Sequence, residues 1–402
     1  RIMTMMRNDQ IDLYRIQSRK DLSGIFQAEK EVQHAQKTEL VGSIEIKSSL
    51  NLMCSSISPK GDMLAASDGA SLMLFSLTYM KENDDEAVIA IDERVPLEAM
   101  HPCSCLHFSP DGTTLACGTL DGPIIILSLP ETSDKSVQGN RMVEVKRIFT
   151  EHVQHALPMT HMAISHDSQW LVAGSNDHFK GAIHVFALEN NEDQSKSYSH
   201  WWPLPQLESP HSCLSFIGGE SVESALAVAC SDNSFYLFDV KERSLSEWSQ
   251  DIGIPFLRKM PQEIATIPDY PVRLVSNPAE PSKFLLGSHG NFFVVDLSRK
   301  IPQSSNYYPS RDLRSKRTWL EKQTSDAKDW TNKRKRSRST SCGDNVVKEE
   351  PLETNFTICL RYNAMLFLEF IGKNEMIVVE QPWAPIFDAL PDPLVSKTYG
   401  LA

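Results

Sequence analysis

Degraded copies of one sequence repeat recur along this chain, and this repetition constrains the fold more than any single residue does. The clearest copy, Cys105–Leu127, reads CLHFSPDGTTLACGTLDGPIIIL. Four weaker copies lie at Cys54–Phe75, Met162–Phe186, Cys213–Val240 and Val272–Leu297. Aligned on Ser58, Ser109, Ser165 and Ser215, successive copies are 51, 56 and 50 residues apart. A period of about this length, with several short strands per repeat, is typical of a β-propeller.

The clearest copy and the residues after it predict four strands. The strands are Cys105–Ser109, Leu115–Gly118, Ile124–Leu129 and Val143–Phe149. Pro110-Asp111-Gly112 predicts a turn after the first strand, because proline presets φ and glycine accepts a positive φ. Asp121-Gly122 is a second hairpin signal. Four strands make one blade, and a lone blade leaves its faces uncovered, so neighbouring blades must stack on it.

The copies resemble WD repeats that have lost part of their signature. The Gly-His pair that usually opens such a repeat is missing, and the closing Trp-Asp survives only as Phe238-Asp239 and Val295-Asp296. In WD repeats an aspartate usually anchors a turn by hydrogen bonding. The aspartates at this position are Asp68, Asp121, Asp177 and Asp232. We interpret these four residues as structural rather than catalytic.

The repeats predict an all-β chain with a WD-repeat-like β-propeller of seven blades. The alternative is six blades, if the two partial ends merge into one composite blade. Residues 1–43 would form a partial blade and a linker, either from an upstream propeller or as a closing blade, and residues 44–299 the main series of blades. Residues 300–352 would be a basic, disordered insertion before the last blade. Residues 353–402 would form that last blade and an extended tail.

Short apolar runs at the two ends predict further strands. The chain opens with a strand pair, Ile2–Met6 and Ile11–Ile16, and does not begin with Met. We therefore expect an unknown length of upstream sequence to be missing. After the insertion, the runs Phe356–Leu360, Ala364–Ile371 and Glu375–Glu380 predict the strands of the last blade.

Charge is distributed unevenly along the chain. The net charge is −12, but residues 311–340 contain eleven Lys or Arg against four Asp or Glu. The densest positions are Lys333, Arg334, Lys335, Arg336 and Arg338, with an upstream group at Arg314, Lys316 and Arg317. Such a stretch indicates nuclear localisation through importin, an RNA contact, or a solvated loop that only keeps the protein soluble. Ser337, Ser339 and Ser341 lie within or beside it as possible phosphorylation sites, where phosphate would reduce the local positive charge.

Other patterns argue against membrane, metal and catalytic roles. No window approaches the roughly 20 consecutive apolar residues of a membrane span. Eight scattered cysteines without a disulfide-like spacing favour a reducing intracellular compartment. His152, His155, His161 and His166 cluster in sequence, but no neighbouring Cys or carboxylate completes a metal-ligand spacing. No phosphate-binding glycine loop or nucleophile elbow is present, so we expect no cofactor and no enzyme activity.

The C-terminal sequence resembles the end of the cirhin family, WD-repeat subunits of the nucleolar small-subunit processome. The resemblance is carried by Leu366–Phe370, by Met376–Trp383 with Glu380, Pro382 and Trp383, by Ala389–Pro393 and by Lys397–Gly400. Gln381 stands where the family has Arg, and Asp392 interrupts a run of prolines. The basic insertion also matches the family layout.

The resemblance implies a scaffold subunit without catalysis or a small-molecule substrate, in the nucleus and nucleolus. Cirhin-like proteins carry two tandem propellers, of which this chain would be the second. Their partners are other WD-repeat and helical subunits and the 5′ external transcribed spacer of pre-rRNA, and the family is linked to rRNA transcription. One alternative is a generic WD-repeat adaptor, such as a ubiquitin-ligase substrate receptor or a signalling scaffold. Another is a propeller enzyme, which would need inward-facing ionisable groups in its channel.

Overall fold

The described part of the chain consists of β-strands with one short helical turn. The computed structural model describes residues 2–16, 38–48, 50–82, 86–95, 101–129, 144–148, 158–176, 181–190, 196–218, 225–253, 269–277, 280–298, 356–359, 364–372 and 375–381. The helical turn is the π-helix η2 (Trp248–Gly253). In this part of the chain no helix has the length and apolarity needed to cross a membrane.

The described strands form seven sheets, in which strands that follow one another in sequence are neighbours. The first sheet has three strands, β1 (Ile2–Met6), β2 (Gln10–Ile16) and β3 (Thr38–Glu45). The second has β4 (Leu52–Ile57), β5 (Met63–Asp68), β6 (Leu72–Glu82) and β7 (Glu86–Val95). The third has β8 (Cys103–Phe108), β9 (Thr114–Thr119), β10 (Ile124–Ser128) and β11 (Glu144–Ile148).

The remaining sheets repeat this order. The fourth has β12 (Met159–Ile164), β13 (Trp170–Asn176), β14 (Gly181–Asn190) and β15 (Lys196–Pro203). The fifth has β16 (His211–Ile217), β17 (Ala225–Cys230), β18 (Phe235–Asp239) and β19 (Ser244–Leu245). The sixth has β20 (Arg273–Ser276), β21 (Lys283–Gly287), β22 (Phe292–Asp296) and β23 (Phe356–Cys359). The seventh has two described strands, β24 (Met365–Gly372) and β25 (Glu375–Glu380).

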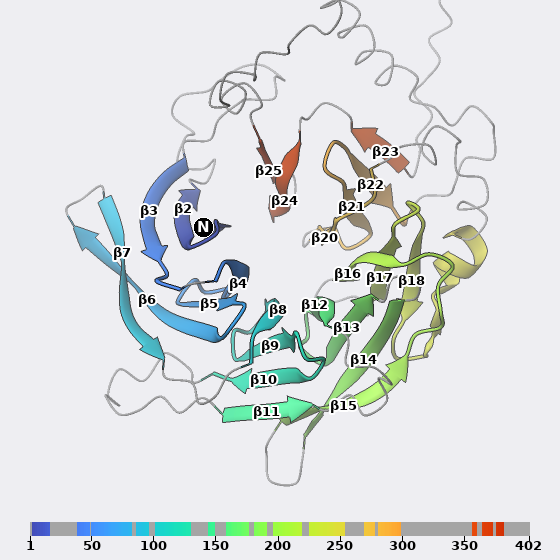
Figure 1. Ribbon diagram of the computed structural model, residues 1–402. Helices are drawn as coiled ribbons and strands as arrows, with labels where there is room; N and C mark the ends of the chain where they lie inside the picture. Colours follow the sequence, from blue (N-terminus) through green and yellow to red (C-terminus); the bar gives the residue numbers. More distant parts are fainter. Residues whose placement is uncertain are drawn as a thin grey trace, which may run out of the picture. The chain divides into compact units, whose positions relative to one another are not determined.

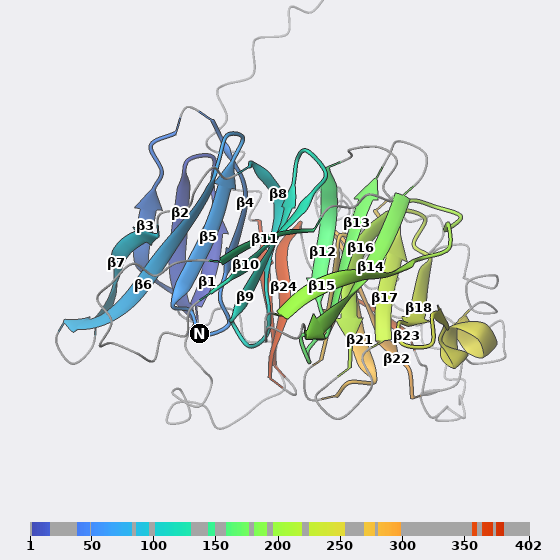
Figure 2. The same cartoon turned by 90° about the horizontal axis from the view of Figure 1, so that it is seen from below.

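The chain divides into two compact units. Unit 1 comprises Arg1–Ser231 and Tyr236–Ser246, and unit 2 comprises Asp232–Phe235 and Glu247–Ala402. Within unit 1, the first strands of successive sheets pack side by side, β4 on β8, β8 on β12 and β12 on β16. Figure 1 shows β8 and β12 next to each other, with the outer strands β11 and β15 of the same sheets farther out. Figure 2 shows the same sheets side by side from another direction.

Burial between neighbouring sheets explains the small, apolar second strands. Every residue of β5 and nearly every residue of β9 and β17 is buried. In β9 a Cβ added at Gly118 would lie 2.5 Å from Cys105 Sγ and 2.7 Å from Met159 Cβ. The small side chains of these strands therefore allow the next sheet to approach closely.

A β-bulge recurs in the first strand of five sheets. The register skips one residue at Met53, Ser104, Thr160, Ser212 and Leu366. Three of these residues carry hydroxyls that donate to the facing second strand: Ser104 to Gly118 O, Thr160 to Gly174 O and Ser212 to Ala229 O. A bulge leaves its extra residue outside the ladder, and the hydroxyl bond fixes that residue in place. The bulge thus recurs at the same position of five first strands, although the residue type at that position differs among them.

Most strands agree with the sequence-based expectations, and the all-β fold class is confirmed. Ile2–Met6 pairs with the strand that contains Ile11–Ile16, and β11 closes the third sheet as its alternating pattern predicted. One assignment is wrong. The run beginning at Phe356 pairs with β22 as the fourth strand of the sixth sheet, and does not open the last blade. The insertion expected at 300–352 consequently lies between two paired strands of one sheet.

The alignment of Ser215 with the other repeat serines is also wrong. Ser58, Ser109 and Ser165 each directly follow the first strand of their sheet, whereas Ser215 lies inside β16 and faces Ala227. Ile217 occupies the position that corresponds to the serines, because Phe216 pairs with Leu226 as Ile164 pairs with Leu171. The sequence alignment of this repeat was therefore off by two residues. The count of seven or six blades and the domain boundaries stay predictions.

Candidate functional site

Most of the candidate functional residues lie outside the described part of the chain. These are the basic residues Arg314, Lys316, Arg317, Lys333, Arg334, Lys335, Arg336 and Arg338, the serines Ser337, Ser339 and Ser341, and Asp177, His152, His155, Pro382 and Trp383. Of the family-signature residues, Glu380 is described. It ends β25, where it faces Met365, and the next residue, Gln381, donates its backbone N–H to Ala364 O at 2.8 Å.

Asp68 closes the hairpin between β5 and β6. Its Oδ1 accepts hydrogen bonds from the N–H groups of Ala70 at 2.8 Å and Ser71 at 2.7 Å, and its Oδ2 accepts one from Ser48 Oγ at 2.6 Å. Burial alone would raise the pKa of Asp68. The bonds from Ser48, Ala70 and Ser71 outweigh burial and hold the pKa below its ordinary value of 3.8. The carboxylate of Asp68 therefore stabilises the turn and links it to Ser48, which is a structural role.

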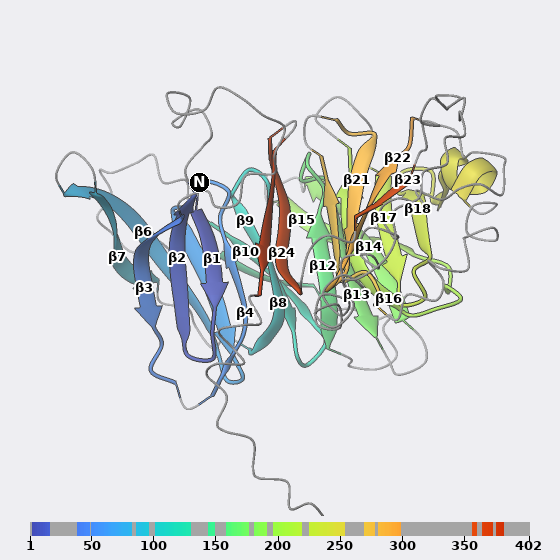
Figure 3. The same ribbon diagram turned by 90° about the horizontal axis from the view of Figure 1, so that it is seen from above.

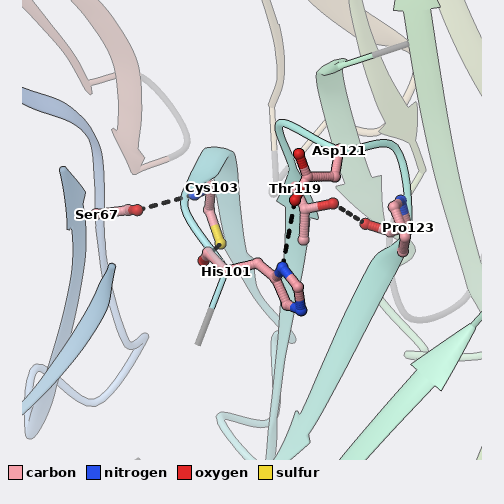
Figure 4. A network of polar contacts seen from close by, with 6 residues as sticks. All are labelled: Ser67, His101, Cys103, Thr119, Asp121 and Pro123. Atoms are coloured by element: carbon pink, nitrogen blue, oxygen red, sulfur yellow. Dashed lines mark hydrogen bonds and ion pairs between the residues drawn. The ribbon is translucent and has the colours of Figure 1, made fainter. Parts of the chain in front are cut away.

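Asp121 and Asp232 have different surroundings from Asp68. Asp232 accepts a hydrogen bond from the N–H of Ser234 at 3.0 Å, which resembles the turn contact of Asp68. Asp121 is largely exposed, and its Oδ2 lies 3.3 Å from Nδ1 of His101. Figure 4 shows this contact beside the bond that joins Ser67 of the second sheet to the N–H of Cys103 in the third.

The aligned serines that follow the first strands are buried and cap the next turn. Ser58 Oγ accepts the N–H of Met63 at 3.0 Å, and Ser109 Oγ accepts the N–H of Thr114 at the same distance. Ser165 Oγ accepts the N–H of Trp170 at 2.9 Å. Each hydroxyl also donates to an aspartate of its turn, Asp62, Asp111 or Asp167. In a catalytic triad a histidine stands between the serine and the carboxylate. These serines instead donate directly to an aspartate, and the bonds close a five-residue turn.

Four thiols lie in or beside the third sheet: Cys54 of the second sheet, and Cys103, Cys105 and Cys117 of the third. Cys54 Sγ donates to Cys103 O at 3.3 Å, and Cys105 Sγ donates to Met159 O at 3.4 Å. Burial, reinforced by the neighbouring thiols, raises the pKa of Cys54 to about 12. Burial likewise raises the pKa of Cys105 to about 12 and that of Cys117 well above 9.0. The thiols of Cys54, Cys105 and Cys117 are therefore protonated at neutral pH and are poor nucleophiles and poor metal ligands.

Two of the four clustered histidines are described, and neither belongs to a set of metal ligands. His161 packs edge-on against His211, with ring centroids 5.4 Å apart. Burial lowers the pKa of His161, and burial together with His161 lowers the pKa of His211 to about 3. In the described ranges no group of three or more His, Cys, Asp or Glu residues could hold a metal ion.

An aromatic surface on the fourth and fifth sheets was missed by the sequence reasoning. Arg243 lies over the ring of Trp201, 3.9 Å from its centroid, and Trp201 Nε1 donates to Val240 O at 3.1 Å. Trp170 lies 5.6 Å from Trp201, and Trp202 packs edge-on against Phe238. The three tryptophans are half-buried and Arg243 is exposed. The string Trp-Trp-Pro-Leu-Pro from Trp201 was the available signal, because tryptophan is enriched in interfaces relative to the rest of a protein surface.

Comparison with known proteins finds a repeat family and a group of relatives that share a name. The family described as "WD domain, G-beta repeat" matches residues 98–122 and 144–179. The mouse protein "U3 small nucleolar RNA-associated protein 4 homolog" is 23% identical over 89% of this chain, and its human counterpart is 22% identical over 89%. The Schizosaccharomyces pombe "U3 small nucleolar RNA-associated protein 4" is 25% identical over 87%. The chain spans 44% of the length of each of these relatives.

The crystal structure of Sqt1 from Chaetomium thermophilum is similar at a TM-score of 0.45 and 16% identity, over 77% of this chain and 68% of that one. The fold assignment does not depend on this superposition. It follows from the WD-repeat match and from sheets of consecutive strands that pack through their first strands. The chain has the all-β fold of the WD-repeat β-propellers.

Proposed function

We propose that this chain is part of a non-catalytic WD-repeat scaffold in a nucleolar complex that assembles the small ribosomal subunit. The observation that carries the proposal is similarity across 87–89% of the chain to relatives named for association with U3 small nucleolar RNA. The buried, protonated thiols and neutral histidines of the described sheets are consistent with a binding role. The processome resemblance of the C-terminal sequence, with Glu380, Pro382 and Trp383, supports the same reading.

The basic residues supply the first test, nuclear and nucleolar localisation through importin. Lys333, Arg334, Lys335 and Arg336 are changed together to Ala in the full-length protein, which is imaged in cells. We expect nucleolar accumulation to be lost, because a dense run of positive charge is what import receptors recognise. Changing the exposed Lys47 and Lys60 to Ala is the control for a general loss of charge. Unchanged accumulation of the four-residue variant would remove localisation from the role of this stretch.

RNA contact is tested separately, by crosslinking to pre-rRNA at increasing salt. Binding through several phosphates releases counterions, so crosslinking should fall steeply with salt, and the Ala variant should show a shallower slope. The 5′ external transcribed spacer is the expected site. Crosslinking that does not respond to salt would exclude a phosphate contact by Arg314, Lys316, Arg317 and the downstream group.

Affinity purification distinguishes the scaffold from a generic WD-repeat adaptor. We expect U3 small nucleolar RNA and other WD-repeat and helical subunits of the complex to co-purify with the full-length protein. Changing Trp201 to Ala should weaken recovery, because half-buried tryptophans beside an exposed arginine commonly anchor protein interfaces. Recovery of cullin-type or kinase partners without U3 small nucleolar RNA would support the adaptor instead.

A further inference from the structure

The dipeptide Asp-Gly occurs three times in this chain, at Asp68, Asp111 and Asp121. It rearranges without an enzyme when the backbone nitrogen of the glycine reaches the side-chain carboxyl of the aspartate. Glycine favours this reaction because it has no Cβ and adopts more backbone conformations than other residues. The three copies share this local chemistry, so their surroundings in the folded protein decide which of them reacts.

The rearrangement passes through a cyclic succinimide. The glycine nitrogen attacks the side-chain carboxyl carbon, so that a C–N bond forms, a C–O bond breaks and one water leaves. Water then adds to one of the two imide carbonyls and breaks its bond to nitrogen. Opening at the side-chain carbonyl restores aspartate. Opening at the main-chain carbonyl gives isoaspartate, whose main chain runs through the side chain and whose α-carboxyl is free.

Asp68 is kept from this reaction by its surroundings. The residue is 3% exposed, and its carboxylate accepts hydrogen bonds from Ser48, Ala70 and Ser71. Attack requires the nitrogen and the carboxyl carbon to meet in a defined orientation. The carboxylate of Asp68 must therefore lose these hydrogen bonds before it can turn toward Gly69.

At Asp111 both reacting groups are held. The carboxylate accepts hydrogen bonds from Ser109 Oγ and from the N–H and Oγ1 of Thr113, the last two at 3.0 and 2.9 Å. The attacking nitrogen belongs to Gly112, which donates its N–H to Ser109 O at 2.9 Å. Asp111 is exposed, so hydrogen bonds rather than burial restrain it.

Asp121 is held by fewer contacts than the other two aspartates. Its side chain is 64% exposed, and its polar neighbour among the described residues is Nδ1 of His101, at 3.3 Å. Figure 4 shows this exposed pair, a kind of contact that contributes little to stability. Gly122 has a φ of +104°, and its N–H donates to Thr119 O over a long distance of 3.4 Å. Both reacting groups of this copy are therefore weakly held.

We propose that Asp121 is a site of isoaspartate formation, and that the freed α-carboxyl is methylated by a carboxyl methyltransferase that uses S-adenosylmethionine. In this transfer a carboxylate oxygen attacks the methyl carbon of the sulfonium, a C–O bond forms and S-adenosylhomocysteine leaves. The methyl ester then closes to the succinimide as methanol leaves. Repeated cycles of hydrolysis and methylation return the residue to aspartate.

Isoaspartate at this position would lengthen the main chain of the turn between β9 and β10, which Figure 3 shows side by side. Thr119 closes the turn by donating its N–H and its hydroxyl to Pro123 O, at 3.2 and 2.7 Å. Leu120 donates its N–H to Pro102 O at 3.0 Å, just before β8. One additional main-chain carbon between Thr119 and Pro123 strains or breaks these bonds, so the modification weakens this turn.

Storage of the full-length protein at neutral pH tests the proposal. After digestion, isoaspartate at each of the three positions is measured by mass spectrometry with electron-transfer fragmentation, which distinguishes it from aspartate. We expect isoaspartate to accumulate at least about tenfold faster at Asp121 than at Asp68 or Asp111, because their carboxylates must first lose hydrogen bonds. Equal rates at the three positions, or a slower rate at Asp121, would overturn the proposal.

The same measurement in guanidinium chloride separates the effect of the fold from that of the local sequence. Unfolding removes the hydrogen bonds of Asp68 and Asp111, so the three rates should become similar. If Asp121 stayed fastest by the same factor, the neighbouring Pro123 rather than the fold would set its rate. The structural argument would then be wrong.

A single substitution tests the restraint at Asp111. Thr113→Val removes one hydrogen bond to the Asp111 carboxylate with little change in side-chain shape. Isoaspartate should then form several times faster at Asp111, and at an unchanged rate at Asp121. No increase at Asp111 would contradict the role assigned to its hydrogen bonds.

Asp121→Glu is the control for methylation. Glutamate keeps the negative charge at an exposed position, but its longer side chain closes a six-membered ring, which forms more slowly. Stored protein is incubated with an isoaspartyl carboxyl methyltransferase and labelled S-adenosylmethionine. The peptide that contains residue 121 should carry label in the unchanged protein and lose most of it in the variant. Equal labelling of this peptide in both proteins would place the methylated residue elsewhere and contradict the proposal.

Discussion

At the residue scale, one glycine position controls how closely the sheets approach. Gly118, Gly174 and Gly287 all lie near the end of a second strand. A Cβ added at Gly174 would lie 2.5 Å from His211 Nε2, and one added at Gly287 would lie 2.7 Å from Leu368 Cδ2. In each case the added Cβ would clash with a residue in the first strand of the following sheet, which is Met159 for Gly118. Glycine is needed here for space, although the same residue type in a strand interior normally weakens it.

Gly118→Ala should therefore destabilise the fold. Its Cβ would meet Met159 Cβ at 2.7 Å as well as two sulfur atoms. We expect a loss of roughly 1–3 kcal/mol in the free energy of unfolding, measured by urea denaturation, because overpacking forces the sheets apart. Gly290→Ala is the matched control, since its nearest contact would be an ordinary 3.6 Å. Equal stability of the two variants would contradict the role assigned to Gly118.

Histidine burial predicts sensitivity to acid. The pKa of His211 is lowered from 6.5 to about 3. Between these values the unfolded chain binds a proton that the folded chain does not, so stability is fully present above pH 6.5 and falls as pH decreases. At pH 5 the contribution of His211 to this loss is about 2 kcal/mol. Thermal denaturation between pH 7 and 5 should show a smaller fall in Tm for His211→Gln than for the unchanged protein.

The exposed His101→Gln variant is the control for this pH dependence. His101 lies 3.3 Å from Asp121 at the surface, where an ion pair contributes little to stability. Its pH profile should match that of the unchanged protein. If the His211 variant also kept the full pH dependence, the acid sensitivity would have another origin.

At the element scale, the hairpin between β5 and β6 depends on one carboxylate. Asp68→Ala removes the acceptor for Ser48 and for the N–H groups of Ala70 and Ser71. Because three part-buried donors would lose the charged acceptor that the buried Asp68 supplies, we expect a loss of about 1–3 kcal/mol in urea denaturation. Asp121→Ala, in an exposed position, should change stability by less than about 0.5 kcal/mol. Similar losses for both variants would contradict this prediction. They would mean that Asp68 and Asp121 stabilise their turns equally, as their matching positions in the sequence repeat suggest.

The strands themselves were predictable, and their partners were less so. Alternating apolar residues and Pro-Asp-Gly or Asp-Gly turns located the strands of the third sheet, because side-chain period and turn chemistry are local properties. The pairing of β23 with β22 was not predictable, because the intervening residues 297–355 give no local signal of the partner. Ser215 failed as an alignment marker for a similar reason, because its position within β16 is defined by its pairing with Ala227 of the next strand. The contact of Arg243 with Trp201 likewise joins residues that are far apart in sequence.

At the scale of the whole molecule, the long connection between β22 and β23 offers a test of the insertion. Residues 301–350 are replaced by a Gly-Ser linker of about ten residues. Closing a shorter loop costs less chain entropy, by about 0.6 kcal/mol for each halving, so stability should rise by about 1 kcal/mol. Urea denaturation measures this change. A marked loss of stability would show that the replaced residues are part of the fold rather than an insertion, while nucleolar localisation should be lost in either case.

The sequence by itself determined the all-β class, the repeat, most strands and the location of the positive charge. Each of these depends on residues within a few positions of one another, or on composition. Only the tertiary structure decided that residues 297–355 connect two paired strands of the sixth sheet and that a bulge recurs in five first strands. These features depend on which backbone groups meet across the sheets, and local sequence does not encode the identity of a distant hydrogen-bonding partner.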